Sequence, residues 1–278
     1  MVLMTKIVYF LLCHGPIEPI LRLVDTLLEM DQNGKVLVHY DKRGPKHNFE
    51  QLVRRYYDSG RCQVITGQGR VKCAWGTFGL VRSVLNAFEY LRQNRVDYSH
   101  FYLLSGSCFP IKPLTELRDF LQVNAATEFI ECQDENWIRG GIKKDRYLYH
   151  YLVSKREHPK LFRWSYLVQK KLRLRRQLVK NLTIKFGSQW WCLSRDTVSK
   201  IVSFAECNAS INSFFRTVWI PDECFFQTLV FHLCEEKNIA NRSLTYYEFM
   251  TDGRPRSFQN SDVTDGIRNK YFFIRKYY

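Results

Sequence analysis

Hydrophobic residues in the first half of the chain follow two alternating patterns. Continuous apolar runs of strand length, such as KIVYFLLCH, alternate with longer stretches in which apolar residues recur every three or four positions. A short continuous run predicts a buried strand, and the longer period predicts an amphipathic helix. We expect strands at 6–14, 35–40, 61–66 and 99–106, and helices at 17–30, 78–91 and 114–121.

Strands that alternate with helices indicate an α/β fold. Parallel strands need crossover connections, so we expect one compact domain with a mostly parallel sheet and helices on both faces. Ligands of such sheets bind beyond the carboxyl ends of the strands. This rule brings His14, Asp41 and the Ser105-Gly106-Ser107 turn to one crevice. Each of them alone is more typical of an ordinary turn, and only their convergence indicates a site.

The second half of the chain is less regular and carries most of the charge. TEFIEC, at 127–132, predicts a fifth strand. Between residues 155 and 185, eleven Lys or Arg side chains and the single acid Glu157 give +10 of the total net charge of +15. LVQKKLRLRRQLVK, at 167–180, places leucines among cations. The pattern is consistent with an amphipathic helix on an acidic membrane or a polyanionic acceptor, or with a solvated helix face.

Composition restricts the class of protein further. The chain has 278 residues, 45% of them hydrophobic, which is enough for one large core. Its charge favours an anionic partner: a nucleotide, nucleic acid, acidic lipid or acidic glycan. We see no secretory signal and no apolar run of the roughly 18 residues that span a membrane. Nine cysteines without a CxxC pair indicate reduced thiols in a cytosolic protein.

Several catalytic motifs are missing from the sequence. There is no GxGxxG after the first strand, and no GxxxxGK[ST], GxSxG or HExxH, which excludes dehydrogenase, P-loop, esterase and zinc-protease interpretations. The thirteen aspartates also include no Asp-x-Asp pair to hold a divalent cation on a diphosphate. Cationic side chains would have to take that role. A basic end of the chain offers Arg254, Arg256, Arg268, Lys270, Arg275 and Lys276, although such an end is usually only solvated.

The segment IPDECFFQTLVFHL, at 220–233, has two acids at the head of an apolar stretch with helical spacing. Pro221 suits the first turn of a helix, and an acid there complements the helix dipole. We expect Asp222 to cap this helix. Glu223 then points elsewhere and is a candidate general base for an alcohol.

Seven blocks of the sequence match one known family in order along the chain. They are LLCHGPIEPILRLVDTL, VLVHYDKR, CAWGTFGLVRSVLNAF, FYLLSGSCFPIKPLTEL, FGSQWWCLSRDTVSKIV, IPDECFFQTLV and YFFIRKYY. In these blocks the chain resembles a bacterial-type member of the core-2/I-branching enzymes. These are inverting glycosyltransferases that include β-1,6-N-acetylglucosaminyltransferases and peptide O-xylosyltransferases.

The resemblance implies a GT-A-like, Rossmann-type fold, a UDP-sugar donor, and neither a metal nor another cofactor. It implies that Glu223 is the catalytic base and that Lys276 with Arg275 binds the diphosphate. Arg254 and Arg256 are rivals for a further phosphate-binding arginine. The residues at the nucleotide and its sugar would be Cys13, His14, Gly15, Asp41 and Trp75.

On the acceptor side the resemblance leaves alternatives open. Glu128 and Glu131 both qualify as the acceptor-binding acid. Trp190 and Trp191 would line the sugar pocket, or would be buried core aromatics. We expect residues 1–125 to form the nucleotide-binding half, and residues 126–278 the acceptor-binding and catalytic half with its basic insert.

The expected reaction moves GlcNAc or xylose to a hydroxyl of a glycan or lipid-linked glycan and forms a β-glycoside. We expect a cytoplasmic enzyme in surface glycan biosynthesis, with peripheral contact at the inner face of the plasma membrane through residues 155–185. The alternative is a basic nucleotide- or nucleic-acid-binding protein without transferase activity. The sequence contains no RNP or helix-turn-helix motif, so no nucleic-acid partner is expected.

Overall fold

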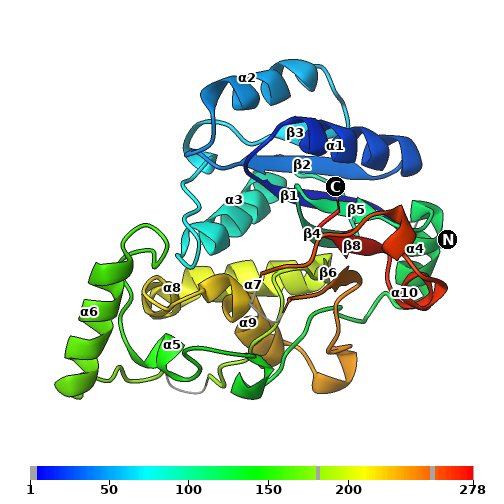
Figure 1. Cartoon of the computed structure of the whole chain (residues 1–278). Coiled ribbons are helices and arrows are strands. Elements are labelled where there is room, and N and C mark those ends of the chain that lie inside the picture. Colours follow the sequence, from blue (N-terminus) through cyan, green and yellow to red (C-terminus); the bar gives the residue numbers. More distant parts are fainter. Residues whose placement is uncertain (1–4, 180–181, 251–253, 278) are drawn as a thin grey trace.

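The structure, a computed structural model, describes residues 5–179, 182–250 and 254–277 and contains a five-stranded main sheet (Figure 1). The order of its strands is β3-β2-β1-β4-β6, and β6 alone runs antiparallel. This arrangement confirms the expected α/β fold and the four strands predicted in the first half. The strands are β1 (Ile7–Cys13), β2 (Lys35–Tyr40), β3 (Cys62–Val64), β4 (His100–Ser105) and β6 (Cys192–Ser194).

Helices cover both faces of this sheet because alternate residues of each strand point to opposite sides. From β1, Val8 and Phe10 join the core against one set of helices, whereas Tyr9 and Leu11 join the core against the other. The first set is α3 (Gly79–Gln93), α7 (Arg195–Cys207) and α9 (Phe225–Leu233). The second set is α1 (Glu18–Met30), α2 (Lys46–Arg55) and α4 (Leu114–Val123).

A second, three-stranded sheet joins the carboxyl end of the chain to its first half. Its order is β5-β8-β7, and β8 (Phe273–Arg275) pairs antiparallel with β5 (Cys108–Pro110) and parallel with β7 (Thr245–Tyr247). The short helix α10 (Asp265–Lys270) precedes β8. Because β5 follows the turn after β4, the last strand lies at the carboxyl edge of the main sheet.

Three expectations for the second half were wrong in detail. Residues 127–132 form only isolated bridges, such as Phe129 with Cys192, and the fifth strand is β6. The helix in the basic segment is α6 (Pro159–Lys171), and the residues after it are not helical as far as 179. Lys180 and Asn181, inside the predicted range, lie outside the described residues. The helix expected from Pro221 is divided into a 3₁₀ turn (Pro221–Glu223) and α9.

Two short helices connect α6 with the core. They are α5 (Asp145–Leu148) and α8 (Ala209–Phe215), and Figure 1 shows both near α6 at the edge of the molecule farthest from the small sheet. Among the residues that the structure describes, no helix has both the length and the apolarity to cross a bilayer.

Candidate active site

The carboxyl ends of β1, β2 and β4 bring together the polar residues predicted to form one crevice. The Asp41 N–H donates to the Cys13 carbonyl at 2.8 Å, and the Gly106 N–H donates to the Leu12 carbonyl at 3.0 Å. These two bonds continue the sheet just beyond its strands. His14, Asp41 and the turn after β4 therefore lie side by side, as expected for adjacent parallel strands.

Asp41 is a fixed anion in this crevice. Its Oδ1 accepts from the backbone N–H groups of Arg43 and Cys73, at 2.9 and 3.1 Å, and its Oδ2 accepts from the Arg43 guanidinium at 2.9 Å. Burial raises the pKa of the Asp41 carboxyl, but the bonds from Arg43 and Cys73 outweigh it and leave the pKa below its ordinary value. Asp41 thus remains ionised and ties the backbone at Arg43 to the backbone at Cys73.

His14 lies within electrostatic range of the basic end of the chain. Loss of hydration is the largest effect and lowers the pKa of His14, and the charges of Lys276, Arg275 and Arg43 add to the lowering, while Asp41 opposes it. His14 is therefore neutral at pH 7. A neutral imidazole beside these cations does not repel them, and it can still hydrogen-bond a ligand.

The basic end of the chain is held against the turn after β4. The Tyr277 N–H donates to the Ser107 carbonyl at 3.0 Å, and the Arg275 Nε donates to the Ser105 Oγ at 3.2 Å. Strand pairing between Arg275 and Cys108 adds to this attachment. Residues some 170 positions apart thus form one wall of the crevice.

The two rival arginines occupy different settings. Arg256 pairs with Glu248 at 2.9 Å and with Asp262 at 3.2 Å, and its carbonyl accepts from the Lys276 N–H at 3.3 Å. Arg254 is exposed, and its carbonyl accepts from the Met250 N–H at 2.7 Å. Arg256 therefore supports the backbone of Lys276 while its own guanidinium is held by carboxylates.

Glu223 sits in a 3₁₀ turn that follows a strained residue. Ile220, a β-branched residue, has a φ of 55°, a left-handed conformation that such residues rarely adopt. Its N–H donates to the Gly76 carbonyl at 3.1 Å, which fixes the turn. Arg146, from α5, donates from Nη1 to the Glu223 Oε2 at 2.7 Å. The Arg146 side chain is only 8% exposed and that of Glu223 is 25% exposed.

Burial raises the pKa of the Glu223 carboxyl. The charge and hydrogen bond of Arg146 oppose that rise, and the nearby charge of Glu131 adds to it. A carboxylate with a raised pKa is a stronger base than an exposed one, and the hydrogen bond from Arg146 holds it in one orientation. Both properties suit a proton acceptor.

Asp222 does not cap a helix, which corrects the sequence-based expectation. Neither the 3₁₀ turn nor α9 has a side-chain cap, and the Asp222 Oδ1 is buried without a hydrogen-bond partner among the described residues. Burial and the adjacent Glu223 charge raise the pKa of Asp222 to about 7. The two neighbouring acids therefore titrate together, as closely coupled carboxyl groups do.

Glu131 and Glu223 lie close enough to interact electrostatically because the backbones of both pack against Gly187. The Gly187 N–H donates to the Glu223 carbonyl at 3.0 Å, and a Cβ at Gly187 would stand 2.3 Å from the Glu131 carbonyl oxygen. The Glu131 Oε2 accepts from the Ser188 N–H at 2.8 Å and from the Tyr247 hydroxyl at 2.9 Å. Glu131 is therefore the candidate acceptor-side acid that shares the site with Glu223.

Aromatic rings connect Glu131 with the basic end of the chain. The rings of Tyr247 and Trp190 lie 5.1 Å apart, and the Arg275 guanidinium lies 4.2 Å above the Trp190 ring. Tyr247 and Arg275 are also partners in the pairing of β7 with β8. A row of contacts thus runs from Glu131 to Arg275, the residue before Lys276.

Two residues predicted for the acceptor side belong to the structural core. Glu128 is buried and accepts from Ser194 and Thr197 at the start of α7, which makes it a support for that helix. Trp191 is fully buried between Phe101 and Phe226. Neither side chain lines the crevice. Trp190 is also buried, with an exposure of 5%, and packs in the core, although its ring contacts Tyr247 and Arg275. Of the predicted acceptor-side residues, only Glu131 is therefore placed beside Glu223.

Trp75 and Cys73 close the crevice on the side of α3. The Trp75 ring meets that of Trp219 edge to face at 6.1 Å, and Trp219 lies 5.2 Å from the Arg146 guanidinium. Burial, followed by the charge of Asp41, raises the pKa of the Cys73 thiol to about 12, with a smaller contribution from Asp222. Cys73 therefore lies between the Asp41 side and the Glu223 side of the site.

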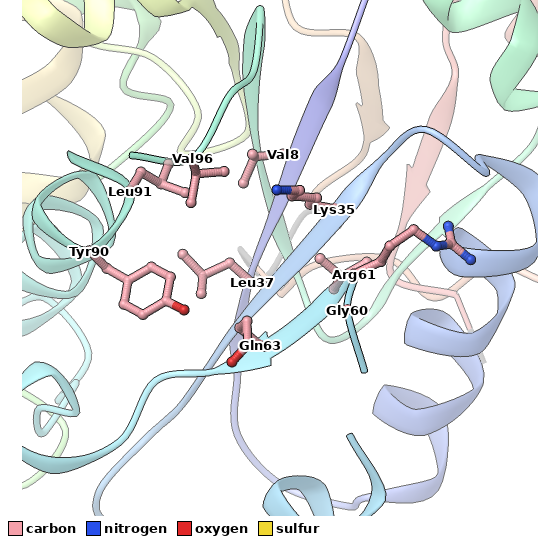
Figure 2. A pocket seen from close by; sticks show the side chains of 10 residues that line it. Val8, Lys35, Leu37, Gly60, Arg61, Gln63, Tyr90, Leu91 and Val96 are labelled. Atoms are coloured by element: carbon pink, nitrogen blue, oxygen red, sulfur yellow. The ribbon is translucent and has the colours of Figure 1, made fainter. Parts of the chain in front are cut away.

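Two pockets help to locate the site within the molecule. One pocket, with a volume of about 240 Å³, lies at the amino ends of the parallel strands and is lined by residues that include Lys35, Leu37, Gln63 and Tyr90 (Figure 2). It is therefore at the edge of the sheet opposite to His14 and Asp41. The other, of about 410 Å³, is lined by residues that include Glu18, Arg22, Gly106, Phe109 and Tyr277. This second pocket adjoins the basic end of the chain.

The sequence did not single out Arg146, Gly187 or Tyr247, although all three hold the site together. Arg146 is one of 42 Lys and Arg residues, and it stands close to the basic segment. Only the burial of its side chain distinguishes Arg146 from the other described basic residues. In the part of the chain that the structure describes, no three or more His, Cys, Asp or Glu side chains are grouped so as to hold a metal ion.

The fold and the site together define an α/β protein in which acidic and cationic side chains gather beyond the carboxyl edge of a mostly parallel sheet. The family model for the core-2/I-branching enzyme matches residues 7–270, and the chain belongs to this family.

Two curated relatives agree with this assignment at low identity. A xylosyltransferase of Ciona intestinalis is 24% identical over 98% of this chain and 32% of its own length. A human β-1,3-galactosyl-O-glycosyl-glycoprotein β-1,6-N-acetylglucosaminyltransferase 3 is 25% identical over 80% of this chain and 47% of its own. The chain thus spans a third to a half of these curated relatives. A Bacillus anthracis structure described as a glucose-1-phosphate thymidylyltransferase has a TM-score of 0.36, at 8% identity over 71% of this chain and 74% of that one.

Proposed function

We propose that this protein is an inverting glycosyltransferase that moves GlcNAc or xylose from a UDP-sugar to a hydroxyl group of a glycan or lipid-linked glycan. Membership of the core-2/I-branching family supports the reaction class. The names of two relatives, a xylosyltransferase and a β-1,6-N-acetylglucosaminyltransferase, support these two donor sugars. The arrangement of acids and cations around the crevice supports the mechanism that follows.

Glu223 is the general base in this proposal. Its carboxylate takes the proton of the acceptor hydroxyl, and the acceptor oxygen attacks the anomeric carbon from the face opposite the nucleotide. The bond from that carbon to the phosphate oxygen breaks, and its electron pair leaves with UDP. The product of an α-linked donor is a β-glycoside. Arg146 orients Glu223 through their 2.7 Å hydrogen bond, and Glu131 offers an acceptor for a second hydroxyl.

Lys276 and Arg275 bind the diphosphate and stabilise the charge that develops on UDP. Arg275 is bonded to Ser105, and the Tyr277 N–H is bonded to the Ser107 carbonyl, so the segment that carries both cations is held in place before the substrate arrives. Such preorganisation is the condition for electrostatic catalysis. A departing phosphate needs a positive partner, and two cationic side chains supply it in place of a divalent ion. His14 and Asp41 border the same space.

One observation carries the proposal: a row of contacts joins the acid next to the base with the cations. Glu131, Tyr247, Trp190 and Arg275 follow one another by contacts of 5.1 Å or less. The backbones of Glu131 and Glu223 both pack on Gly187, and Lys276 follows Arg275 in the chain. A sugar nucleotide held at Lys276 can therefore present its anomeric carbon on the side of Glu223.

The test is sugar transfer from a panel of UDP-sugars in excess EDTA, together with calorimetric titration of UDP. We expect transfer to persist in EDTA. Lys276→Ala should weaken UDP binding about 10–100-fold, because a charge-assisted bond to phosphate is lost. Lys270→Ala, an exposed lysine in the last turn of α10, is the matched control and should bind UDP like the wild type. Transfer that stops in EDTA and returns with a divalent ion would contradict the proposal.

A further inference from the structure

Exposed hydrophobic side chains gather in one short part of the molecule. Of the ten large hydrophobic side chains that are exposed among the described residues, seven lie between positions 152 and 178. These seven are Leu152, Leu161, Trp164, Leu167, Leu172, Leu174 and Leu178. A concentration of this kind on a folded domain marks a surface that contacts something other than water.

The helix α6 presents these side chains on a firmly packed base. Its inner face is buried by Phe162, which stacks on Tyr151 at 4.9 Å and contacts Trp219 at 5.3 Å. The Tyr166 hydroxyl donates to Asp145 at 2.6 Å, and Gln169 bonds the backbone of His150. The outward side chains are therefore held in place by the fold.

The outward face mixes apolar and basic residues at helical spacing. Leu161, Trp164 and Leu167 follow one another at intervals of three, and Trp164 is 64% exposed. Exposed cations flank them along the same helix. We name this surface the α6 face, and it consists of Lys160, Leu161, Arg163, Trp164, Leu167 and Lys171.

We propose that the α6 face docks on the surface of an anionic phospholipid bilayer. Trp164 and Leu167 enter the boundary between headgroups and acyl chains, where amphipathic helices bury their apolar side chains. Lys160, Arg163 and Lys171 contact lipid phosphates. Figure 1 shows α6 at the periphery of the molecule, clear of the main sheet, so a flat surface can approach it.

Charge and shape favour lipid over two other partners. Residues 155–185 carry a net charge of +10, so a second copy of this chain would be repelled from the same surface. A nucleic acid would satisfy the cations, but its phosphates offer nothing to the exposed leucines. A bilayer satisfies both kinds of side chain at once.

Docking of the α6 face also fixes the orientation of the candidate active site. Tyr166 of α6 bonds Asp145, and the next residue, Arg146, bonds Glu223. Only two hydrogen bonds and one peptide link thus separate the proposed lipid surface from the proposed base. The docking itself does not depend on the reaction at Glu223.

The test is flotation of the full chain with vesicles of phosphatidylcholine alone, or mixed with about one third phosphatidylglycerol. We expect binding only to the anionic vesicles, and its loss between about 0.1 and about 1 M salt, where screening becomes strong. Trp164→Ser with Leu167→Ser should weaken binding at least about tenfold. Lys160→Gln with Arg163→Gln and Lys171→Gln should weaken it about 100-fold.

Matched controls change equally exposed residues elsewhere. Tyr57→Ser with Val123→Ser removes two hydrophobic side chains that are 78% and 86% exposed. Lys46→Gln with Arg54→Gln and Lys237→Gln removes three exposed cations. Both controls should float like the wild type. All variants should bind UDP and unfold thermally like the wild type, which shows that the fold is intact.

Fluorescence identifies the inserted residue. Lipids with brominated acyl chains should quench the tryptophan fluorescence of the wild type, and Trp164→Phe should float normally but lose most of this quenching.

Absence of anionic vesicle binding, equal binding by the serine variant, or equal quenching in Trp164→Phe would overturn the proposal. So would binding of RNA in place of vesicles, or a dimer in light scattering that the serine variant dissociates. Failure of sugar transfer alone would leave the docking result standing.

Discussion

Arg146 and Glu223, 77 positions apart in the sequence, are joined by a hydrogen bond of 2.7 Å at the edge of the crevice. The Arg146 side chain is nearly buried, whereas the Glu223 side chain is partly exposed. A paired, positioned carboxylate next to a second acid and opposite two cations is the arrangement on which the proposed mechanism depends.

Replacement of Glu223 by Gln should abolish transfer while UDP still binds. The amide keeps the size of the side chain but cannot accept the acceptor's proton, so turnover should fall about 10²–10⁴-fold. Initial rates and UDP calorimetry on the same preparation measure both properties. Glu236→Gln, on an exposed 3₁₀ turn, is the control. Unchanged turnover in Glu223→Gln would remove this residue from its role.

Arg146→Met should shift the pH dependence of transfer. The Arg146 charge lowers the pKa of Glu223, so its removal raises that pKa and moves the acidic limb of the rate profile to higher pH. Loss of a partner for a buried group should also cost about 1–3 kcal/mol in the free energy of unfolding. A profile of kcat/KM against pH reports the change in the pKa of Glu223 and distinguishes it from the loss of stability. An unmoved acidic limb would show that Arg146 has only a structural role.

Asp222 should make the protein less stable as pH rises toward neutrality. Its pKa is about 7 in the folded protein against an ordinary value of 3.8, so between these values the folded chain holds a proton that the unfolded chain has released. Stability should therefore fall from about pH 4 to about pH 7 and then level off.

Asp222→Asn removes this titration. Its free energy of unfolding should vary less over the same range and should exceed that of the wild type at about pH 8 by on the order of 2 kcal/mol. Urea unfolding at a series of pH values gives the comparison, with the exposed Asp119→Asn as control. Parallel curves for wild type and Asp222→Asn would rule out the proposed titration of this carboxyl.

Gly187→Ala should separate Glu131 from Glu223. The new methyl group would stand 2.3 Å from the Glu131 carbonyl oxygen, so the backbone must move. We expect a loss of about 1–3 kcal/mol in stability together with lower turnover. Gly60→Ala, whose methyl group would meet no heavy atom within 4 Å, should stay within about 0.5 kcal/mol of the wild type. Full activity in Gly187→Ala would indicate that the spacing of the two acids is unimportant.

Three strands of the first half, β1, β2 and β4, were predictable because they are buried on both faces. All seven residues of β1 are buried, and such strands read as continuous apolar runs. The strands of the second half, β6, β7 and β8, have three residues each, which is too short for a period to appear. The apolar run at 127–132 misled because it reaches its neighbours only through isolated bridges.

The residues of the candidate site also differ in how far the sequence predicts them. His14 and Asp41 follow strands that the pattern predicts, so their meeting follows from the topology. Arg146, by contrast, lies in an irregular region among many cations, and its pairing with Glu223 depends on long-range packing. Whether Trp190 or Trp191 faces the crevice depends on one residue of register, which a pair of adjacent tryptophans does not reveal.

The most direct test of the central claim is a crystal structure of the protein with UDP. We expect the diphosphate within hydrogen-bond distance, about 3 Å, of the Lys276 Nζ, beside His14 and on the side of the crevice that faces Glu223. A diphosphate bound away from Lys276, or bridged to aspartates by a metal ion, would contradict it.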